Sequence, residues 1–506
     1  MILRNNYLLI LISAITVGIS QHFVQLGFLS WFGLIPFLKV IQSEYNRNVL
    51  LKYSFLWGII YHLIVTFWLS TNIGTTPAIA FIIMVLSIII LSFNTVFISL
   101  LWYYSKDYSP RYKMILFAII WVVVEYIRSY GLLGFPWVSL ANSQTHYLYL
   151  IQNVEYTGIY GITFWILLVN VFVFHLMKSK NKYQYLYYFI LLLLPWLTGY
   201  HLYHNQDEIN PSFRGLPLIE QIPEESLSVT VIQPNIGLTD KRDFKNRNDM
   251  LNTLIDSTLN NVSYNTELVI WPESAMPFHS IQSQHVTYFL PRLFFRDFYL
   301  LTGTIFRGND NVYNSSALVN KNGLQGIYHK RQLIPLAEHF PFSENFNFLK
   351  NINIGQANFS KGREDYVFNI DNYKFASLIC IESTFPEINR RHANMGIDAI
   401  IYLVNDGWYL TPPEPRQHAR QSIFRAIENR IPIIRCANTG ISQIINSKGV
   451  VEEEIGLNKF GTIHVNINKN NKVKTFYTRF GNIFSLILSV ITILVLILSR
   501  IKNEKK

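Results

Sequence analysis

The sequence predicts a multi-span α-helical membrane domain joined to a layered α/β domain. Half of the 506 residues are hydrophobic and only 15% are charged, well below the ~25% of ordinary soluble domains. Long apolar runs fill residues 7–200 and return at residues 483–498. Between them, residues 204–480 carry short β-branched runs that alternate with helical stretches, a pattern typical of a layered α/β domain.

About eight apolar runs are candidates to cross a bilayer, which takes about 20 mostly apolar residues in a helix. The predicted spans are residues 7–18, 23–40, 51–69, 78–104, 114–127, 159–177, 185–200 and 483–498. The first run lacks a small-residue cleavage site and the second follows almost at once, so we interpret it as a span rather than a signal peptide. The predicted domains are a bundle of about seven spans (1–203), an exterior domain (204–480) and a final span with a basic tail (481–506).

The position of the charges predicts the orientation. Of the basic and acidic residues, 28 and 27 lie in residues 204–480, which leaves 15 and 5 for the apolar flanks. Loops 106–113 and 178–182 hold three Lys or Arg each, whereas the alternate loops 70–77 and 131–157 hold none. Because cytoplasmic loops are enriched in Lys and Arg, both termini should be cytoplasmic and residues 204–480 exterior. A near-neutral soluble part also excludes a nucleic-acid partner.

The exterior domain should contain strands and helices in alternation. The predicted strands are 227–233, 267–271, 299–304, 373–381, 399–404, 432–437 and 442–446, and the clearest helices are 248–260 and 416–428. No Gly-rich phosphate loop is present. The triplets Asn261-Val-Ser and Asn314-Ser-Ser match the glycosylation acceptor pattern, but so short a match is close to chance.

Cys380 is the candidate nucleophile. It ends the apolar run 375–379, and Glu382 follows two residues later. Two other readings stay open at this point, because a free cysteine is commonly a small buried hydrophobe and because Cys380 and Cys436 could form a disulfide outside the cytoplasm. A thiol is mostly protonated at neutral pH, so a nucleophilic role would need a base or a cation nearby.

Three further charged residues could supply those groups. Glu273 follows the strand-like run 268–271, and Lys330 follows the strand-like run 325–329. Glu338 lies in the loop after Lys330. Each has an ordinary alternative: Glu273 could begin a helix after Pro272, and the other two could be solvated surface charges.

The order and spacing of these motifs resemble the nitrilase superfamily. The segments are Trp271-Pro-Glu273, Tyr328-His-Lys330 with Leu336-Ala-Glu338 after it, Ile379-Cys-Ile-Glu382, and Val404-Asn-Asp-Gly-Trp408. The resemblance implies a four-layer α-β-β-α sandwich and acyl transfer through a cysteine thioester. It implies that Glu273, Lys330 and Cys380 form the catalytic triad, with Glu338 and Glu382 as supporting residues.

Two segments in the apolar part narrow the resemblance. Glu125-Tyr-Ile-Arg128 and Gly134-Phe-Pro-Trp137 resemble the membrane part of apolipoprotein N-acyltransferases. The resemblance implies a phospholipid acyl donor, expected to be phosphatidylethanolamine, and an S-diacylglyceryl-cysteine apolipoprotein as acceptor. It also implies a bacterial cytoplasmic (inner) membrane protein whose catalytic domain faces the periplasm, acting in the last step of lipoprotein maturation.

Both substrates are amphiphiles held in the bilayer, so the site should open toward lipid. Aromatic residues that suit this opening are Phe135, Trp137, Phe346, Phe348 and Trp408. The long connection 342–359, rich in Phe, is predicted either to be a mobile lid or to fold onto its own domain.

Two rival functions remain. A membrane-anchored amidase would share the triad but pass the thioester to water. A transporter or binding protein should carry charges along several spans, whereas Glu125 and Arg128 are the clear cases here and are spaced for a local i,i+3 pair. No HExxH motif or Cys/His cluster is present, so we expect no metal and no cofactor.

Overall fold

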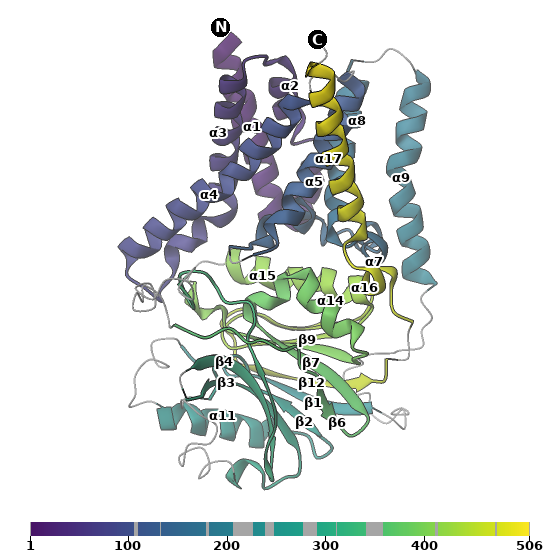
Figure 1. Cartoon of the computed structure of the whole chain (residues 1–506). Coiled ribbons are helices and arrows are strands. Elements are labelled where there is room, and N and C mark those ends of the chain that lie inside the picture. Colours follow the sequence, from purple (N-terminus) through teal and green to yellow (C-terminus); the bar gives the residue numbers. More distant parts are fainter. Residues whose placement is uncertain are drawn as a thin grey trace. The chain divides into compact units, whose positions relative to one another are not determined.

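The computed structural model describes residues 2–105, 110–131, 133–178, 182–205, 226–237, 247–276, 291–309, 311–340, 358–409, 413–470 and 473–504. The chain divides into two compact units. The helical unit comprises residues 1–71, 77–206 and 480–506, and the α/β unit comprises residues 72–76 and 207–479 (Figure 1). The short segment 72–76 therefore groups with the α/β unit although it connects two apolar helices.

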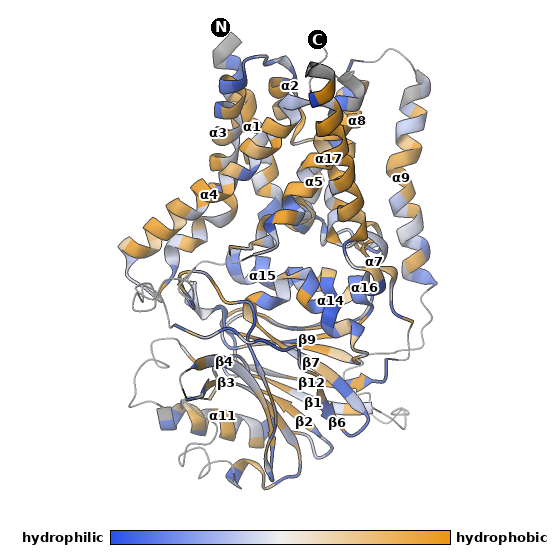
Figure 2. Cartoon of the chain, viewed as in Figure 1, coloured by the Kyte–Doolittle hydropathy of each residue, from blue (hydrophilic) through white to orange (hydrophobic). Residues whose placement is uncertain are grey.

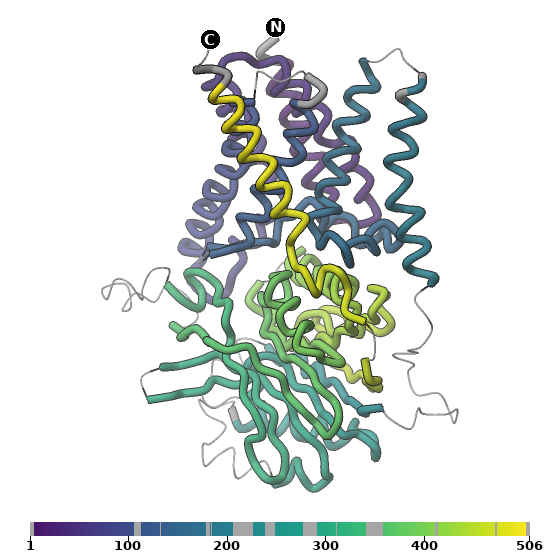
Figure 3. The backbone as a smooth tube through the Cα atoms, turned by 45° about the vertical axis from the view of Figure 1, so that its right-hand side comes forward, coloured from purple at the N-terminus to yellow at the C-terminus, as the bar shows by residue number. Residues whose placement is uncertain are grey.

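The helical unit is built from long apolar helices joined by short ones. Its elements are α1 Ile2–His22, η1 Val24–Trp31, α2 Ile35–Ser43, α3 Arg47–Thr66, η2 Phe67–Thr71, α4 Pro77–Tyr104, α5 Pro110–Arg128, η3 Pro136–Val138, η4 Leu140–Gln144, α6 Leu148–Ile151, α7 Val154–Thr157, α8 Ile159–Leu176, α9 Lys182–His204 and α17 Ile483–Glu504. Figure 2 shows that α4 and α17 are hydrophobic along most of their length. α17 packs against α5 despite their separation in the sequence (Figure 3).

Six segments in the described residues are long and apolar enough to cross a membrane, and they confirm the multi-span class. They are Val24–Ser43, Arg47–Thr71, Pro77–Tyr104, Ile159–Leu176, Tyr185–His204 and Ile483–Ile501. The other two predicted spans fall on α1 and α5, so the number eight stays a prediction. The segment Val24–Ser43 is divided between η1 and α2, because Pro36 lacks an N–H and lies in the first turn of α2.

Glu125 is a buried carboxylate inside the helical unit and is fully hydrogen-bonded. Oε1 accepts from Trp121 Nε1 and Leu140 N, both at 3.1 Å. Oε2 accepts from the hydroxyls of Ser139 at 2.7 Å and Thr163 at 2.9 Å. The predicted local pair with Arg128 is wrong: the hydroxyl and N–H donors occupy both oxygens, and Arg128 Nε and Nη2 have no hydrogen-bond partner among the described residues.

The α/β unit is a sandwich of two six-stranded sheets. One sheet has the order β12-β1-β2-β3-β4-β5 and the other β11-β10-β9-β8-β7-β6. Their strands are β1 Ser226–Gln233, β2 Leu268–Ile270, β3 Tyr299–Arg307, β4 Val312–Asn320, β5 Gly323–His329, β6 Phe368–Ile370, β7 Tyr373–Ile379, β8 Ala399–Val404, β9 Ile433–Ala437, β10 Ser442–Ile445, β11 Val451–Ile455 and β12 Gly461–Asn468. β1 lies beside β9 and β4 beside β7, so the sheets face each other.

Helices cover the two outer faces of the sandwich. Helix α11 (Arg247–Asn261) packs on the first sheet, where its Leu251, Leu254 and Ile255 join a buried core. Helices α14 (Pro386–Asn394) and α15 (Pro413–Asn429) lie together on the opposite side of the two sheets (Figure 1). The central strand β8 is buried at every residue, as expected for a parallel strand covered on both faces. This arrangement confirms the predicted α-β-β-α class.

In each sheet the three central strands are parallel, so their carboxyl ends lie at the same edge of the sheet. β1, β2 and β3 run parallel, and so do β7, β8 and β9. The predicted strand 373–381 is two residues too long, because β7 ends at Ile379 and the 3₁₀ helix η6 (Cys380–Thr384) follows at once. The β-branched Ile381 favours a strand in the sequence, but Cys380 leaves the extended conformation with φ of 52°.

Candidate active site

Glu273, Lys330 and Cys380 each follow the end of a strand. Glu273 lies three residues after β2, Lys330 comes directly after β5, and Cys380 comes directly after β7. β2 and β7 are mainly buried apolar strands, whereas β5 is mostly half-buried or exposed and buries only Tyr328. The ends of all three strands release polar side chains into loops. Cys380 has φ of 52°, a region that side-chain-bearing residues rarely adopt and that often marks functional sites.

The three residues converge inside the α/β unit. Lys330 Nζ lies 3.6 Å from Glu273 Oε1. The Cys380 thiol lies near enough to both groups for each to change its pKa. Lys330 is fully buried and Cys380 is 8% exposed. The structure thus brings together the three residues that the sequence singled out from separate segments.

Glu338 holds the Lys330 ammonium more closely than Glu273 does. Lys330 Nζ donates to Glu338 Oε1 at 2.8 Å, and Glu338 Oε2 accepts from Ile334 N at 2.9 Å. Asn314, on β4, donates from Nδ2 to Glu273 Oε1 at 2.8 Å and to Glu338 Oε1 at 3.1 Å. One amide group therefore fixes the spacing of the two carboxylates. Sequence reasoning missed this role, because Asn314 stood out there only within a glycosylation-like triplet.

Glu382 has a different set of partners. Oε1 accepts from the Tyr328 hydroxyl at 2.8 Å, Arg331 N at 2.7 Å and Gln332 N at 3.1 Å. Oε2 accepts from Ile379 N at 2.8 Å. Glu382 thus ties Tyr328 and the chain that follows Lys330 to the end of β7, mainly through backbone N–H groups.

The electrostatics of the three central groups explain their resting protonation. Burial raises the pKa of the Cys380 thiol well above its usual value, and the Glu273 carboxylate raises it further, while Lys330 lowers it. Burial also raises the pKa of Glu273, against the effect of Lys330. Burial lowers the pKa of Lys330, but the Glu338 and Glu273 carboxylates outweigh it and the net pKa is raised. The thiol is therefore protonated at rest, beside a permanent cation and a carboxyl group that is more basic than usual.

Glu273 can accept a proton. Its Oε2 is buried and has no hydrogen-bond partner among the described residues, whereas Oε1 is bonded to Asn314. An unpaired buried oxygen is costly unless a chemical role explains it. The Cys380 thiol interacts with the same carboxylate, so the two groups form an acid–base pair that suits nucleophilic catalysis.

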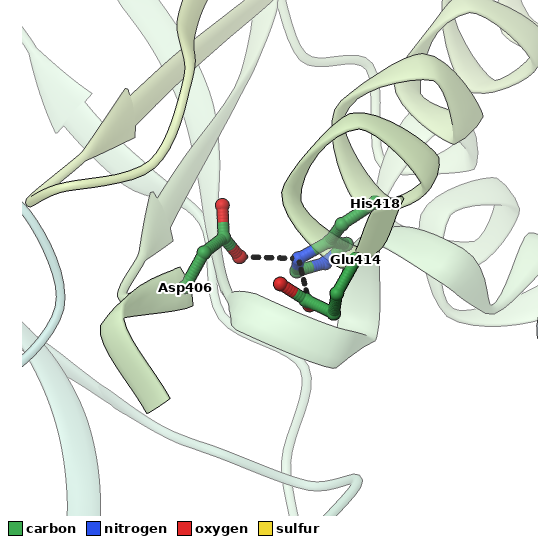
Figure 4. A group of neighbouring side chains, drawn as sticks. All are labelled: Asp406, Glu414 and His418. Carbon is green, nitrogen blue, oxygen red and sulfur yellow. Dashed lines mark hydrogen bonds and ion pairs between the residues drawn. The ribbon is translucent and has the colours of Figure 1, made fainter. Parts of the chain in front are cut away.

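A second buried cluster of ionisable side chains lies next to the backbone carbonyl of Cys380. Asp406, which begins η7 (Asp406–Trp408), and Glu414 and His418, both on α15, have donor atoms within 4.8 Å of one another (Figure 4). Such a spacing could hold a metal ion. Both oxygens of Asp406 already have partners, however: Oδ1 lies 2.7 Å from His418 Nδ1, and Oδ2 accepts a hydrogen bond from Arg435 Nη2 at 2.9 Å. Arg435 adds a positive charge at the same carboxylate. The arrangement is that of a hydrogen-bonded network.

The aromatic residues predicted to line the lipid opening differ in burial and in the unit to which they belong. Trp408 is half-buried in η7, and its carbonyl accepts from Ile73 N at 2.9 Å, within the segment 72–76. In the helical unit Trp137 is only 4% exposed, and its ring packs against Trp68 and Phe135. Phe346 and Phe348, with the greater part of the predicted lid 342–359, lie outside the described residues.

Cys436 is a free cysteine, as is Cys380, so the disulfide reading is wrong. Cys436 lies on β9, and its thiol donates to the carbonyl of Ile232 at 3.4 Å and to that of Ile270 at 3.6 Å. Both carbonyls belong to the facing sheet, which makes Cys436 part of the packing between the sheets.

Comparisons with known proteins bear on the family of the two units. Residues 228–472 match the sequence profile of the carbon-nitrogen hydrolases, and residues 13–172 match that of the apolipoprotein N-acyltransferase N-terminal domain. A yeast nitrilase-superfamily structure, Saccharomyces cerevisiae Nit3, superposes with a TM-score of 0.37 at 18% identity, over 50% of this chain and 93% of its own. The two profile matches define a protein of the carbon-nitrogen hydrolase class that also carries a membrane domain.

Two curated relatives extend the likeness over both units. An apolipoprotein N-acyltransferase of Rickettsia bellii is 30% identical over 75% of this chain and 74% of its own. Another, of Chlorobaculum tepidum, is 28% identical over 87% of this chain and 86% of its own. The chain belongs to the apolipoprotein N-acyltransferase family. It is a multi-pass membrane protein and an acyltransferase.

Proposed function

We propose that the chain transfers a fatty acyl group from a membrane phospholipid to the N-terminal amine of an S-diacylglyceryl-cysteine apolipoprotein. The observation that carries this is the meeting of Glu273, Lys330 and Cys380 in a chain of this family. The donor is expected to be phosphatidylethanolamine. The site is expected to face the periplasm from a bacterial inner membrane, with both termini in the cytoplasm.

In the first step Cys380 takes the acyl group. Oε2 of Glu273 removes the thiol proton, and the thiolate attacks the sn-1 ester carbonyl, so that a C–S bond forms. Lys330 remains an ammonium and stabilises the negative oxygen of the tetrahedral intermediate; one such donor is worth roughly 10²–10³ in rate. The ester C–O bond then breaks, and Glu273 returns its proton to the departing lysophospholipid.

In the second step the thioester acylates the lipoprotein. Glu273 takes a proton from the attacking α-amine while an N–C bond forms. As the C–S bond breaks, Glu273 returns this proton to the sulfur, which regenerates the Cys380 thiol and the ionised base. Glu338 and Asn314 hold Lys330 and Glu273 in position, and Glu382 holds the chain beside them. The aromatic residues Phe135, Trp137, Phe346, Phe348 and Trp408 stay our prediction for lipid access.

Mass spectrometry of the purified enzyme tests the proposal. After incubation with phosphatidylethanolamine vesicles, the peptide that contains Cys380 should gain one fatty-acyl mass, and a diacylated lipopeptide should remove it and become N-acylated. Release of free fatty acid without N-acylated lipopeptide would identify a hydrolase of the amidase type instead. No acyl mass on Cys380 with any phospholipid would contradict the proposal.

A further inference from the structure

A cavity of about 280 Å³ lies inside the helical unit, between α8, α9 and the start of α17. Its volume is close to the lower end of ligand pockets, about 300–1,000 Å³. The apolar part of its lining comes from all three helices and consists of Phe164, Leu168, Phe172, Leu191, Pro195 and Phe484. The cavity belongs to the helical unit alone, and its lining includes none of the residues assigned to the reaction.

Helix α9 runs beside α8 and is fixed to the unit at two levels (Figure 3). The ring of Tyr188 stacks on that of Phe172 with centroids 4.4 Å apart. Two turns further along α9, Asn153 Nδ2 donates to the carbonyl of Pro195 at 2.7 Å. Leu191, which lines the cavity, lies between these two levels. Pro195 has no N–H to donate within the helix, which disfavours a straight α9 that lies flush against α8.

The polar side chains of the lining already have partners within the protein. Asn153 is bonded to Pro195, and Thr157 Oγ1 donates to the backbone carbonyl of Asn153 at 3.3 Å. Trp165 Nε1 donates to the carbonyl of Leu192 at 3.2 Å. A buried water needs two to four polar partners, whereas apolar cavities stay dry and take up apolar molecules. The cavity therefore favours an apolar occupant over water.

The setting of the helices points to lipid as the source of that occupant. α8, most of α9 and most of α17 are long and apolar enough to cross a membrane. Leu168 and Leu191 are half-buried, so the lining reaches the surface of these spans, where the surrounding solvent is hydrocarbon. A helix with its side chains is about 10–12 Å across, too wide for this cavity. An unbranched acyl chain can enter it lengthwise.

We propose that the cavity binds one acyl chain of a bilayer phospholipid that is not a substrate, and that this chain holds α9 against α8. The chain contacts Phe164 and Leu168 on one wall and Leu191 on the other. None of the described lining residues is charged, so binding depends on the hydrocarbon chain and not on the headgroup. The inference is independent of the proposed reaction, because no lining residue takes part in it.

Photolabelling locates the chain. The full-length enzyme is placed in phosphatidylcholine vesicles that contain a small share of an ether-linked phosphatidylcholine with a diazirine in one chain. The ether probe cannot acylate Cys380, so failure of the proposed reaction does not affect the outcome. Mass spectrometry then compares labelled peptides of α8 and α9 with the open face of α17 at Ile493 and Ile497, both exposed.

The expected label on α8 and α9 is about threefold or more above that on α17, because a chain in a pocket is enclosed on most sides. A chain on the open face of α17 touches the protein on one side only. Equal labelling of the three helices, or no label on α8 and α9, would overturn the proposal.

Substitutions that fill the cavity give the matched comparison. Leu168→Trp and Leu191→Trp add volume from opposite walls, so one of them suffices if the other does not fold. Leu194→Trp is the control, because Leu194 lies on α9 but is exposed and outside the lining. Either filling variant should lower the label on α8 and α9 about threefold, since the space for the chain is lost. The label on α17 should stay unchanged, and the control should change neither. An undiminished label in a folded filling variant would contradict the proposal.

Native mass spectrometry of the enzyme released from the vesicles identifies the occupant. The wild type should retain one more phospholipid per chain than the filling variants do, and phospholipid bound elsewhere should be equal in both. A lipid-free dimer that the filling variants dissociate would assign the cavity to a second copy of the chain, against the proposal.

Discussion

Lys330 and Glu338 form a fully buried ion pair in which Nζ lies 2.8 Å from Oε1, closer than the 3.6 Å that separates Nζ from Glu273. The ammonium is therefore bonded mainly to a carboxylate that has no chemical step assigned to it. Glu273 remains the weaker partner of Lys330, with one oxygen unbonded and ready to take the thiol proton.

This pairing predicts the effect of Glu338→Gln. Without the Glu338 charge, Lys330 should turn to Glu273, and the loss of a repelling carboxylate should lower the pKa of Glu273. A weaker base takes the thiol proton more slowly, so the rate of Cys380 acylation should fall. The acid limb of its pH profile should move to lower pH. An unchanged limb would show that Glu338 does not control Glu273.

The raised pKa of Glu273 predicts a pH-dependent acylation rate. The base must be ionised, so activity should be lost as pH falls through a pKa above the ordinary ~4.3 of glutamate. Glu273→Gln should lower the rate about 10²–10⁴-fold, the usual contribution of a general base, and should remove this limb. The measurement is single-turnover acylation across pH in the wild type and the variant. A limb that survives in Glu273→Gln would assign it to another group.

The two cysteines should behave differently. Cys380→Ala should abolish acyl-enzyme formation, whereas Cys436→Ala should keep most activity, because Cys436 contributes packing and two weak bonds to backbone carbonyls. A reducing agent should leave the wild-type rate unchanged, since both thiols are free. Equal loss of activity in the two variants would contradict this division.

Gly303 on β3 should be intolerant of a side chain. A Cβ there would lie 2.5 Å from Ser274 N, 2.6 Å from Glu273 Cα and 2.7 Å from Pro272 O, all backbone positions that cannot move aside locally. We expect Gly303→Ala to displace Glu273 and to reduce acylation strongly. Gly308→Ala is the matched control, because its Cβ would meet only Asn311 O at 3.6 Å. Similar activity in both variants would show that the loop carrying Glu273 adapts.

Glu125 should stabilise the helical unit. Glu125→Leu leaves the donors of Trp121, Ser139, Leu140 and Thr163 without their acceptor, and each unsatisfied buried donor costs about 1–3 kcal/mol. The melting temperature in detergent should fall clearly, whereas Ile127→Ala, an exposed neighbour on α5, should change it little. An unchanged melting temperature in Glu125→Leu would contradict the structural role of this carboxylate.

Much of the fold follows from hydrophobic pattern alone. Long apolar runs mark the helical unit. A helix in lipid must satisfy its backbone N–H and C=O groups by hydrogen bonds within the helix, and its side chains that face lipid must be apolar. Buried strands such as β8 and amphipathic helices such as α11 and α15 stand out for the same reason, because burial selects their side chains. The strands β11 and β12, with half-buried mixed sequences, carried no comparable signal and were missed.

Glu273, Lys330 and Cys380 could be named in advance because each lies at or just after the end of a strand-like run and because their motifs resemble a known superfamily. Asn314, Asp406 and His418 were not assigned a role, since their functions depend on partners 12 to 41 residues away in the chain. Hydrogen bonds over such separations leave no periodicity and no local composition to detect. They exist because two sheets and a covering helix meet at the strand ends, and that meeting is a property of packing in three dimensions.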